Sequence, residues 1–193
     1  MAYPELYILR HGQTEWNAEG RLQGALNSPL TALGRQQAQT QRMILETRDL
    51  TGFDAIMSPQ GRAVETAGIA VAPLVGQLTT DPRLREIEVG EWSGRQRDTL
   101  GVPYEASELP GETLGIYEAA PGGEGLDALE RRCRGFLNDL TGPAVIVSHG
   151  ITGRMLRALW LGVGQQGLGD LPGGQGVVFH LCDERHNVLR SAA

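Results

Sequence analysis

Short, mostly apolar runs recur along the chain and stop abruptly at polar residues. Three runs share this pattern: residues 6–9 before Arg10-His11-Gly12, residues 53–57 before Ser58-Pro59, and residues 144–147 before Ser148-His149-Gly150. A short apolar run bounded by turn signals is typical of a strand that is buried on both faces. We therefore predict three buried strands, each followed by a polar loop at its carboxyl end.

Longer segments between these strands have the pattern of helices. The predicted helices are residues 33–50, 62–74, 126–140 and 152–161. Thr31 precedes the first of them and is suited to be its N-cap, because its hydroxyl can accept a hydrogen bond from a free backbone N–H. Strands are also predicted within residues 75–81 and 176–182, and a polar turn at residues 183–187 leads to a short tail. Strands that alternate with helices indicate an α/β fold with a mostly parallel sheet.

The length of 193 residues suits one domain. Residues 91–123 are the least regular part, because glycine and proline recur throughout them. We interpret them as an excursion over one end of the sheet. The chain has no internal repeat, low-complexity tract or strong linker. We therefore expect a single domain over residues 1–193, with an irregular insertion at about residues 91–123 that covers the active site.

Charge narrows the range of partners. The formal net charge is -6 and the pI is about 5.2, which argues against a general nucleic-acid or membrane-surface binder, since such proteins present a basic face. All 17 basic residues are arginine. Without lysine the chain cannot form a P-loop or a Schiff base, both of which need a lysine amine. A small anionic substrate remains compatible with an acidic protein whose pocket is locally basic.

Two cysteines, Cys133 and Cys182, are too few for a disulfide framework, and the chain opens without the pattern of a signal peptide. No apolar run approaches the length of a membrane-spanning helix. We therefore expect a reduced, cytoplasmic setting. Neither cysteine is followed by the arginine spacing of a cysteine-based phosphatase, so both are interpreted as packing residues.

The strand ends carry the candidate chemistry. In open α/β sheets, ligands bind beyond the carboxyl ends of the strands. Arg10-His11-Gly12 and Ser148-His149-Gly150 lie at two such ends, and the strand at residues 53–57 leads to Arg62. If these strands are neighbours, two histidines and two arginines converge on one pocket.

Phosphoryl transfer needs such a set of side chains. Arginine forks bind phosphoryl oxygens and keep their charge. A neutral imidazole can attack phosphorus, and a second histidine can donate a hydrogen bond as negative charge develops. The glycine after each histidine permits close backbone approach, and a following helix N-terminus adds N–H donors.

Several longer stretches resemble the histidine phosphatase superfamily, also called the phosphoglycerate mutase-like family. They occur in the family's order and cover nearly the whole chain: LYILRHGQTEWNAEGRLQG, SPLTALGRQQA, SPQGRAVETA, LREIEVGEWSG, GGEGLDALERRCRGFL and VIVSHG. The resemblance implies a three-layer α/β/α sandwich and a phosphohistidine mechanism. We expect no cofactor and no metal to be required, since arginine and histidine supply the charge that a metal supplies elsewhere.

The resemblance also implies roles for individual residues. His11 would be the phosphorylated nucleophile, and Arg10, Arg62 and His149 would bind the phosphoryl oxygens. Glu86 would protonate the leaving oxygen and then accept a proton from the attacking water, which requires a pKa near the working pH. Further phosphate-binding positions are Asn17, Gln23 and Gly150.

Two positions depart from the family's pattern. Asn27 lies where many relatives carry aspartate, and it could hold the loop before the next helix in place. Gly125 lies where serine is common, which weakens an expected helix N-cap or pocket hydroxyl. Neither departure removes a catalytic group.

Three functions are compatible with this pattern. We favour a phosphomonoester phosphatase that acts on a small phosphorylated metabolite and releases inorganic phosphate. The alternative is a phosphoglycerate mutase, although mutases of this family are usually longer and exclude water better. A non-catalytic phospho-ligand binding module is disfavoured, because Arg10, His11, Arg62, Glu86 and His149 are all present. The exact substrate and the oligomeric state are not readable from the sequence.

Other signals carry less weight. Glu88 is the second candidate for the acid, because it lies two residues after Glu86. The GxGxxG spacing at residues 162–167 follows a predicted helix instead of a strand, so it is interpreted as a loop. His186 is interpreted as a solvated turn residue and His180 as a core or surface residue. No paired cysteine or HExxH spacing indicates a metal site.

Overall fold

The computed structural model describes residues 3–101 and 114–191. In these residues six strands form one sheet, in the order β3-β2-β4-β1-β5-β6. Their bounds are β1 (Leu6–Arg10), β2 (Asp54–Met57), β3 (Thr79–Thr80), β4 (Ala144–Ser148), β5 (Val178–Cys182) and β6 (Arg185–Leu189). The pairs β1–β4, β4–β2 and β2–β3 are parallel, whereas β5 and β6 add an antiparallel edge. The prediction of a mostly parallel sheet is confirmed.

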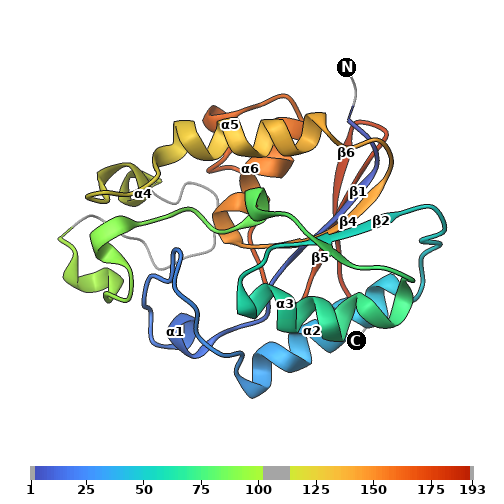
Figure 1. Ribbon diagram of the computed structural model, residues 1–193, viewed down its shortest axis with the longest axis horizontal. Helices are drawn as coiled ribbons and strands as arrows, with labels where there is room; N and C mark the ends of the chain where they lie inside the picture. The colour runs from blue at the N-terminus through green and yellow to red at the C-terminus, as the bar shows by residue number, and fades with distance from the viewer. Residues whose placement is uncertain (1–2, 102–113, 192–193) are drawn as a thin grey trace.

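Helices cover both faces of this sheet. They are α1 (Glu15–Ala18), α2 (Ala32–Leu45), α3 (Gly61–Ala70), α4 (Gly115–Ala119), α5 (Gly125–Asn138) and α6 (Gly150–Trp160). Figure 1 shows α2 and α3 on one face of the sheet and α5 and α6 on the other. The three-layer α/β/α sandwich implied by the family resemblance is therefore present. Thr31 caps α2 as predicted, since its hydroxyl accepts a hydrogen bond from the N–H of Gly34.

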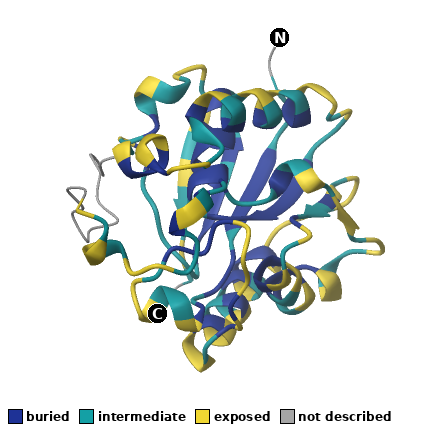
Figure 2. Ribbon diagram, turned by 60° about the vertical axis from the view of Figure 1, so that its left-hand side comes forward, coloured by how far each residue is buried: buried dark blue, intermediate teal, exposed yellow. Residues whose placement is uncertain are grey.

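Both faces of the central strands are buried, which explains the apolar runs in the sequence. Along β1, Leu6 and Ile8 pack into the core shared with α5 and α6, whereas Tyr7 and Leu9 pack into the core beneath α2 and α3. All five residues of β4 are buried, and the strands lie in the buried centre of Figure 2. Because side chains alternate between the faces, a strand covered on both sides is apolar at nearly every position.

The last part of the chain differs from the prediction. Residues 183–187 were predicted to form a polar turn before a tail, but the turn is only Asp183 and Glu184, and β6 begins at Arg185. Both turn residues have positive φ, 48° and 61°, as a tight two-residue hairpin requires. Asparagine and glycine are the usual residues there, so an Asp-Glu pair gives no hairpin signal. His186 consequently lies on a strand and is partly buried, and its interpretation as a solvated turn residue was wrong.

The irregular segment at residues 91–123 is partly described. It contains short 3-10 turns at Gly90–Trp92 and Arg97–Thr99 and the helix α4. Residues 102–113 lie outside the described residues, so the predicted coverage of the active site by the whole segment stays a prediction. In the described part of the chain, no helix combines the length and apolar character needed to cross a bilayer.

Candidate active site

The carboxyl ends of β1 and β4 bring the two motif histidines together. The strands pair in parallel with Arg10 opposite Ser148. One residue further, the N–H of His11 donates to the carbonyl of Ser148 at 3.0 Å. The imidazole rings of His11 and His149 have centroids 5.2 Å apart. The sheet register alone therefore places the two imidazoles side by side.

His11 is held as a neutral imidazole with one nitrogen directed at an arginine. Its Nδ1 is 2.7 Å from the carbonyl oxygen of Gly12, which can only accept, so Nδ1 carries the proton. Nε2 is then unprotonated and accepts a hydrogen bond from Nε of Arg62 at 3.3 Å. Burial, followed by the charges of Arg62 and Arg10, lowers the pKa of His11 well below its ordinary value. This is the protonation state that a nitrogen nucleophile needs.

Arg62 is anchored by the loop that precedes α2. It lies in the first turn of α3, is 1% exposed, and its terminal nitrogens donate to the carbonyls of Leu26 at 2.7 Å and Gly24 at 3.1 Å. Burial lowers the pKa of Arg62 to about 10, although the carboxylate of Glu86 opposes the shift. The guanidinium therefore stays charged at neutral pH, and its position is fixed by backbone contacts.

His149 is oriented by a serine at the end of β2. Its Nε2 is 2.7 Å from the hydroxyl of Ser58, and the same hydroxyl accepts a hydrogen bond from the N–H of Gln60. The Ser58 proton is therefore available to donate to Nε2, which leaves the proton of His149 on Nδ1. Nδ1 is buried and has no hydrogen-bond partner among the described residues. Burial and the charge of Arg62 lower the pKa of His149 well below its ordinary value.

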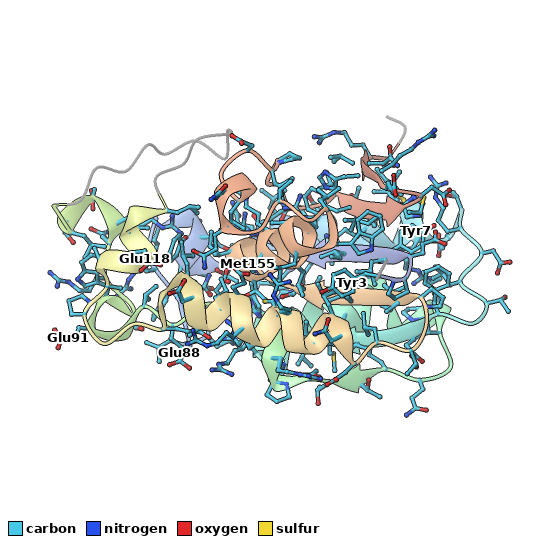
Figure 3. All side chains as sticks on the ribbon, turned by 90° about the horizontal axis from the view of Figure 1, so that it is seen from above. Tyr3, Tyr7, Glu88, Glu91, Glu118 and Met155 are labelled. Carbon is cyan, nitrogen blue, oxygen red and sulfur yellow. The ribbon has the colours of Figure 1, made fainter. Side chains whose placement is uncertain are left out.

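Glu86 is fixed at the N-terminus of α6. Oε1 accepts a hydrogen bond from the backbone N–H of Thr152 at 3.0 Å, and Oε2 accepts from the N–H of Ile151 at 3.2 Å. The Thr152 hydroxyl lies 3.0 Å from Oε1 and donates its proton to the carbonyl of Arg85 at 2.7 Å. Oε1 also accepts from the N–H of Ile87, so Oε2 is the less engaged oxygen. Glu88, the second candidate, is 44% exposed, pairs with Arg85 and lies at the periphery of the molecule in Figure 3. Its position does not suit an acid in this pocket.

The loop that carries His11 packs directly on α2. A Cβ atom at Gly12 would lie 2.2 Å from the carbonyl oxygen of Gly34, and one at Gly34 would lie 2.1 Å from that of Gln13. The N–H of Gly12 donates to the hydroxyl of Thr66 on α3. Gly12 therefore permits close backbone approach, as predicted. At Gly150 a Cβ would meet Arg10 and Glu86 only at ordinary contact distance, 3.5 and 3.6 Å, so this position places no comparable demand on the backbone.

The predicted side chains line two cavities that share part of their walls. His11, Arg62 and Gln23 line a small cavity of about 30 Å³, and His149 and Gly150 line a cleft of about 280 Å³. Arg10, Asn17 and Glu86 line both. All of the predicted site residues are therefore brought together. Arg97 and Tyr117, from the described flanks of the irregular segment, also line both cavities.

Several positioning residues were not predicted from the sequence. Ser58 orients His149, Gln60 accepts a hydrogen bond from the N–H of Glu86 at 2.7 Å, and Thr152 holds the Glu86 carboxylate. The sequence could have indicated Ser58, because this residue follows a predicted strand whose carboxyl end lies at the same edge of the sheet as those of β1 and β4. No sequence pattern indicates the roles of Gln60 and Thr152, since these roles depend on loops that come together only in the folded protein.

The two departures from the family's pattern have structural consequences. Asn27 accepts a hydrogen bond from the N–H of Arg62 at 2.9 Å, so it holds the N-terminus of α3 rather than the helix that follows it in sequence. Gly125 begins α5 with φ of 72°, and the carboxylate of Glu118 accepts a hydrogen bond from the N–H of Leu126 at 2.7 Å. A glutamate from α4 thus supplies the capping contact that a serine hydroxyl could have made.

A possible metal-ligating cluster lies away from this pocket. Among the described residues, Glu5, His180 and Cys182 place one ligand atom each within 4.8 Å of one another. They lie at the start of β1 and on β5, and none of them lines the cleft. Nε2 of His180 bonds the carboxylate of Glu5 at 2.6 Å, and burial raises the pKa of the Cys182 thiol. These contacts join β5 to the residue that precedes β1 by a side-chain hydrogen bond.

Comparisons with known proteins agree with this geometry. Residues 6–188 match the model of the histidine phosphatase superfamily (branch 1). The chain is 36% identical over 167 residues to "Probable phosphoglycerate mutase GpmB" of Proteus mirabilis (strain HI4320), covering 82% of this chain and 75% of the relative.

Two solved phosphatases have the same fold. The mycobacterial glucosyl-3-phosphoglycerate phosphatase Rv2419c, solved with VO3, has a TM-score of 0.80 and 28% identity, covering 98% of this chain and 100% of that chain. The alpha-ribazole phosphatase from Shigella flexneri has a TM-score of 0.79 and 27% identity, covering 97% of this chain and 96% of that chain. The chain therefore belongs to the histidine phosphatase superfamily, as a hydrolase of the phosphoglycerate mutase family.

Proposed function

We propose that the protein is a phosphomonoester phosphatase that transfers the phosphoryl group of a small metabolite to Nε2 of His11 and then to water. The observation that carries this proposal is the protonation state of His11. The Gly12 carbonyl holds the proton on Nδ1, so the lone pair of Nε2 faces the Arg62 guanidinium in a buried pocket. Relatives and structural neighbours named as phosphatases of small phosphorylated compounds support the same activity.

In the first step, Nε2 of His11 attacks phosphorus and the bond from phosphorus to the ester oxygen breaks. Glu86 enters this step protonated and gives its proton to the leaving oxygen, so the alcohol departs neutral. Oε2 is suited to carry that proton, since it accepts from one backbone N–H whereas Oε1 accepts from two. Proton transfer from a positioned carboxyl group contributes about 10²–10⁴-fold to such reactions.

In the second step, water attacks the phosphohistidine. The Glu86 carboxylate accepts a proton from this water, the bond from phosphorus to Nε2 breaks, and inorganic phosphate is released. His11 returns to its neutral state and Glu86 to its protonated state, so atoms and protons balance over the cycle. The same carboxyl group serves both steps because the leaving oxygen and the attacking water occupy the same side of phosphorus.

Charge on the phosphoryl oxygens is stabilised by groups that are already in place. Arg10 and Arg62 supply guanidinium donors, and Nδ1–H of His149 supplies a buried imidazole donor. Asn17 and Gln23 add amide groups at the cavity wall. Donors that need no reorganisation when charge develops lower the barrier more than flexible ones.

Phosphoglycerate mutase activity is the second candidate, and the curated relative named above favours it. A mutase must return the phosphoryl group to a bound acid before water reaches it. The first step is common to both reactions. Phosphate release from 3-phosphoglycerate, compared with its conversion to 2-phosphoglycerate, separates them. Conversion faster than release would overturn the phosphatase assignment.

The test is to follow phosphate release from p-nitrophenyl phosphate and to trap the intermediate by rapid quenching at alkaline pH, where phosphohistidine survives. We expect wild-type protein to release phosphate and to carry an acid-labile phosphoryl group. His11→Ala should lose both, with kcat lower by more than about 10³-fold, because the nucleophile is removed.

His180→Ala is the matched control. His180 stacks on Tyr7 with ring centroids 4.3 Å apart and does not line either cavity. This variant should keep both turnover and the labelled intermediate. A His11→Ala protein that retains wild-type turnover would refute the phosphohistidine mechanism.

A further inference from the structure

The cleft beside the phosphoryl pocket is rich in arginine. Five arginines line it, whereas Glu86 is the one carboxylate that the described residues contribute. The arginines are Arg10, Arg21, Arg97, Arg154 and Arg157. This concentration occurs on a chain whose net charge is -6. One of the five arginines, Arg21, pairs with Glu19, whereas an arginine of the cleft that lacks a carboxylate partner is suited to bind a second negative group of a ligand.

Arg157 is the most deeply buried of the five. It lies in the last turn of α6 and is 2% exposed. Its Nε donates to the carbonyl of Gly153 at 3.1 Å, one terminal nitrogen is 3.1 Å from Nε2 of His186, and the guanidinium lies 3.8 Å from the centroid of Phe179. Each of these partners is neutral or aromatic, because burial lowers the pKa of His186 to about 4.

No carboxylate of the described residues pairs with Arg157. Instead, the neighbouring charged side chain is Arg154, which lies one helical turn away on the same face of α6 and is 4% exposed. Burial, and then the charge of Arg154, lowers the pKa of Arg157 to about 9. The positive charges of Arg154 and Arg157 are therefore close together, and both buried side chains line the cleft.

Packing alone does not explain why a buried arginine occupies position 157. A buried cation without a carboxylate partner is costly, and an apolar side chain of similar volume generally packs as well or better. Contact with Phe179 and with the C-terminal turn of α6 offsets part of the cost. An anion in the cleft would offset the remainder, because a guanidinium binds carboxylate or phosphate oxygens with charge-assisted hydrogen bonds.

We propose that Arg157 forms a second anion subsite, which selects phosphomonoesters whose alcohol part carries a carboxylate or a second phosphate. The cleft volume of about 280 Å³ lies at the small end of ligand sites, which span about 300–1,000 Å³, so the second anion belongs to a compact substrate. This inference rests on the proposed function, because the same cleft contains Arg10, Glu86 and His149.

Two substrate pairs test the subsite. 3-Phosphoglycerate and glycerol 3-phosphate differ in one carboxylate, and fructose 1,6-bisphosphate and fructose 6-phosphate differ in one phosphate. For at least one pair, wild-type kcat/KM should be about 10- to 100-fold higher for the member with the second anion, since a charged hydrogen bond contributes on that scale. Wild-type protein that prefers neither doubly anionic member would overturn the proposal without any variant.

Arg157→Met removes the charge and keeps much of the side-chain volume. In this variant the ratio of kcat/KM between the two members of the pair should fall toward one, because KM for the doubly anionic substrate rises. Arg157→Lys should restore part of the preference, because it returns a point charge without the fork. Arg42→Met is the matched control, since Arg42 lies on α2 away from the cleft, is partly exposed and pairs with Glu46. It should leave both the activity and the preference unchanged.

The outcomes separate the two proposals. If Arg157→Met lowers kcat/KM equally for both members of the preferred pair, Arg157 only supports the fold and the subsite is refuted, although the phosphatase activity stands. If wild-type protein releases no phosphate from either pair or from p-nitrophenyl phosphate, the proposed function itself fails.

Discussion

His11 and His149 are chemically alike in the sequence, yet their hydrogen bonds give them different tasks. A carbonyl acceptor holds the proton of His11 on Nδ1 and leaves Nε2 unprotonated, with its lone pair directed at Arg62. A serine hydroxyl bonds Nε2 of His149 and leaves Nδ1 as the donor. The nearest neighbour of each ring therefore decides which imidazole attacks and which stabilises charge.

Glu86→Gln tests the acid. The amide keeps the size of the side chain but cannot donate and accept protons in turn, so kcat on glycerol 3-phosphate should fall by about 10²–10⁴-fold. The loss should be smaller with p-nitrophenyl phosphate, because nitrophenolate leaves without protonation. The measurement is steady-state phosphate release for both substrates.

Glu88→Gln is the control for this prediction. Glu88 lies two residues away, is partly exposed and pairs with Arg85. Its replacement should leave kcat within about twofold for both substrates, as is usual for surface substitutions. An equal loss in the two variants would exclude Glu86 as the specific acid.

At the scale of single residues, the sequence identified the chemical groups but not the residues that position them. Motif context predicted His11, Arg62, Glu86 and His149, and the structure places them around two cavities that share part of their walls. Gln60 was missed because its side chain joins the Gly24 carbonyl to the N–H of Glu86, across loops distant in sequence. Such contacts have no local pattern from which they could be predicted.

Helix α2 is coupled to the nucleophile loop through backbone contact. Gly34 lies in the first turn of α2, and the Gln13 backbone occupies the space that a side chain at position 34 would need. The start of α2 therefore sets the position of the loop that carries His11. A glycine that lowers helix propensity is retained because nothing larger fits there.

Gly34→Ala should consequently destabilise the protein, although alanine is the better helix former by about 1 kcal/mol. The added methyl group forces the loop and helix apart, at about 1–3 kcal/mol. Displacement of His11 by about 1 Å should lower kcat by about 10²-fold. Urea unfolding and phosphate release measure the two effects.

Gly68→Ala is the matched substitution on α3. A Cβ at Gly68 meets no atom within 4 Å, so stability should stay the same or rise by up to about 1 kcal/mol, with unchanged activity. If Gly34→Ala behaves like Gly68→Ala, the close contact does not determine the position of the loop.

Most elements were predictable because their patterns are local. The buried runs at β1 and β4 and the Thr31 cap of α2 were readable from the residues themselves. The strand β6 was not, because the turn before it uses Asp183 and Glu184 in a left-handed conformation that favours asparagine or glycine. The antiparallel direction of β5 likewise depends on the path of its connection, which the sequence pattern does not encode.

Across the whole molecule, stability should depend on pH through the buried imidazoles. Burial lowers the folded-state pKa of His11 and His149 well below their ordinary value of 6.5. As pH falls through 6.5, the unfolded chain binds protons that the folded chain does not. The stabilisation is therefore fully present above pH 6.5 and is lost below it, down to the folded-state pKa values.

His149→Gln measures this contribution. Between pH 7.5 and 5.5 the wild-type free energy of unfolding should fall more steeply than that of the variant. Below pH 6.5 the slopes of the two curves should differ by up to about 1.4 kcal/mol per pH unit, which is the value for one proton. Urea unfolding at several pH values gives both curves, and parallel curves would show that His149 titrates alike in the folded and unfolded chains.

The pairing of β1 with β4 has a consequence for synthesis. His11 leaves the ribosome long before Ser148, the residue whose carbonyl its N–H contacts. Until that late strand emerges and inserts between β1 and β2, the arginines and histidines have no common anion pocket. Products truncated before β4 should thus be inert toward phosphate esters, so the growing chain cannot react before β4 has been made.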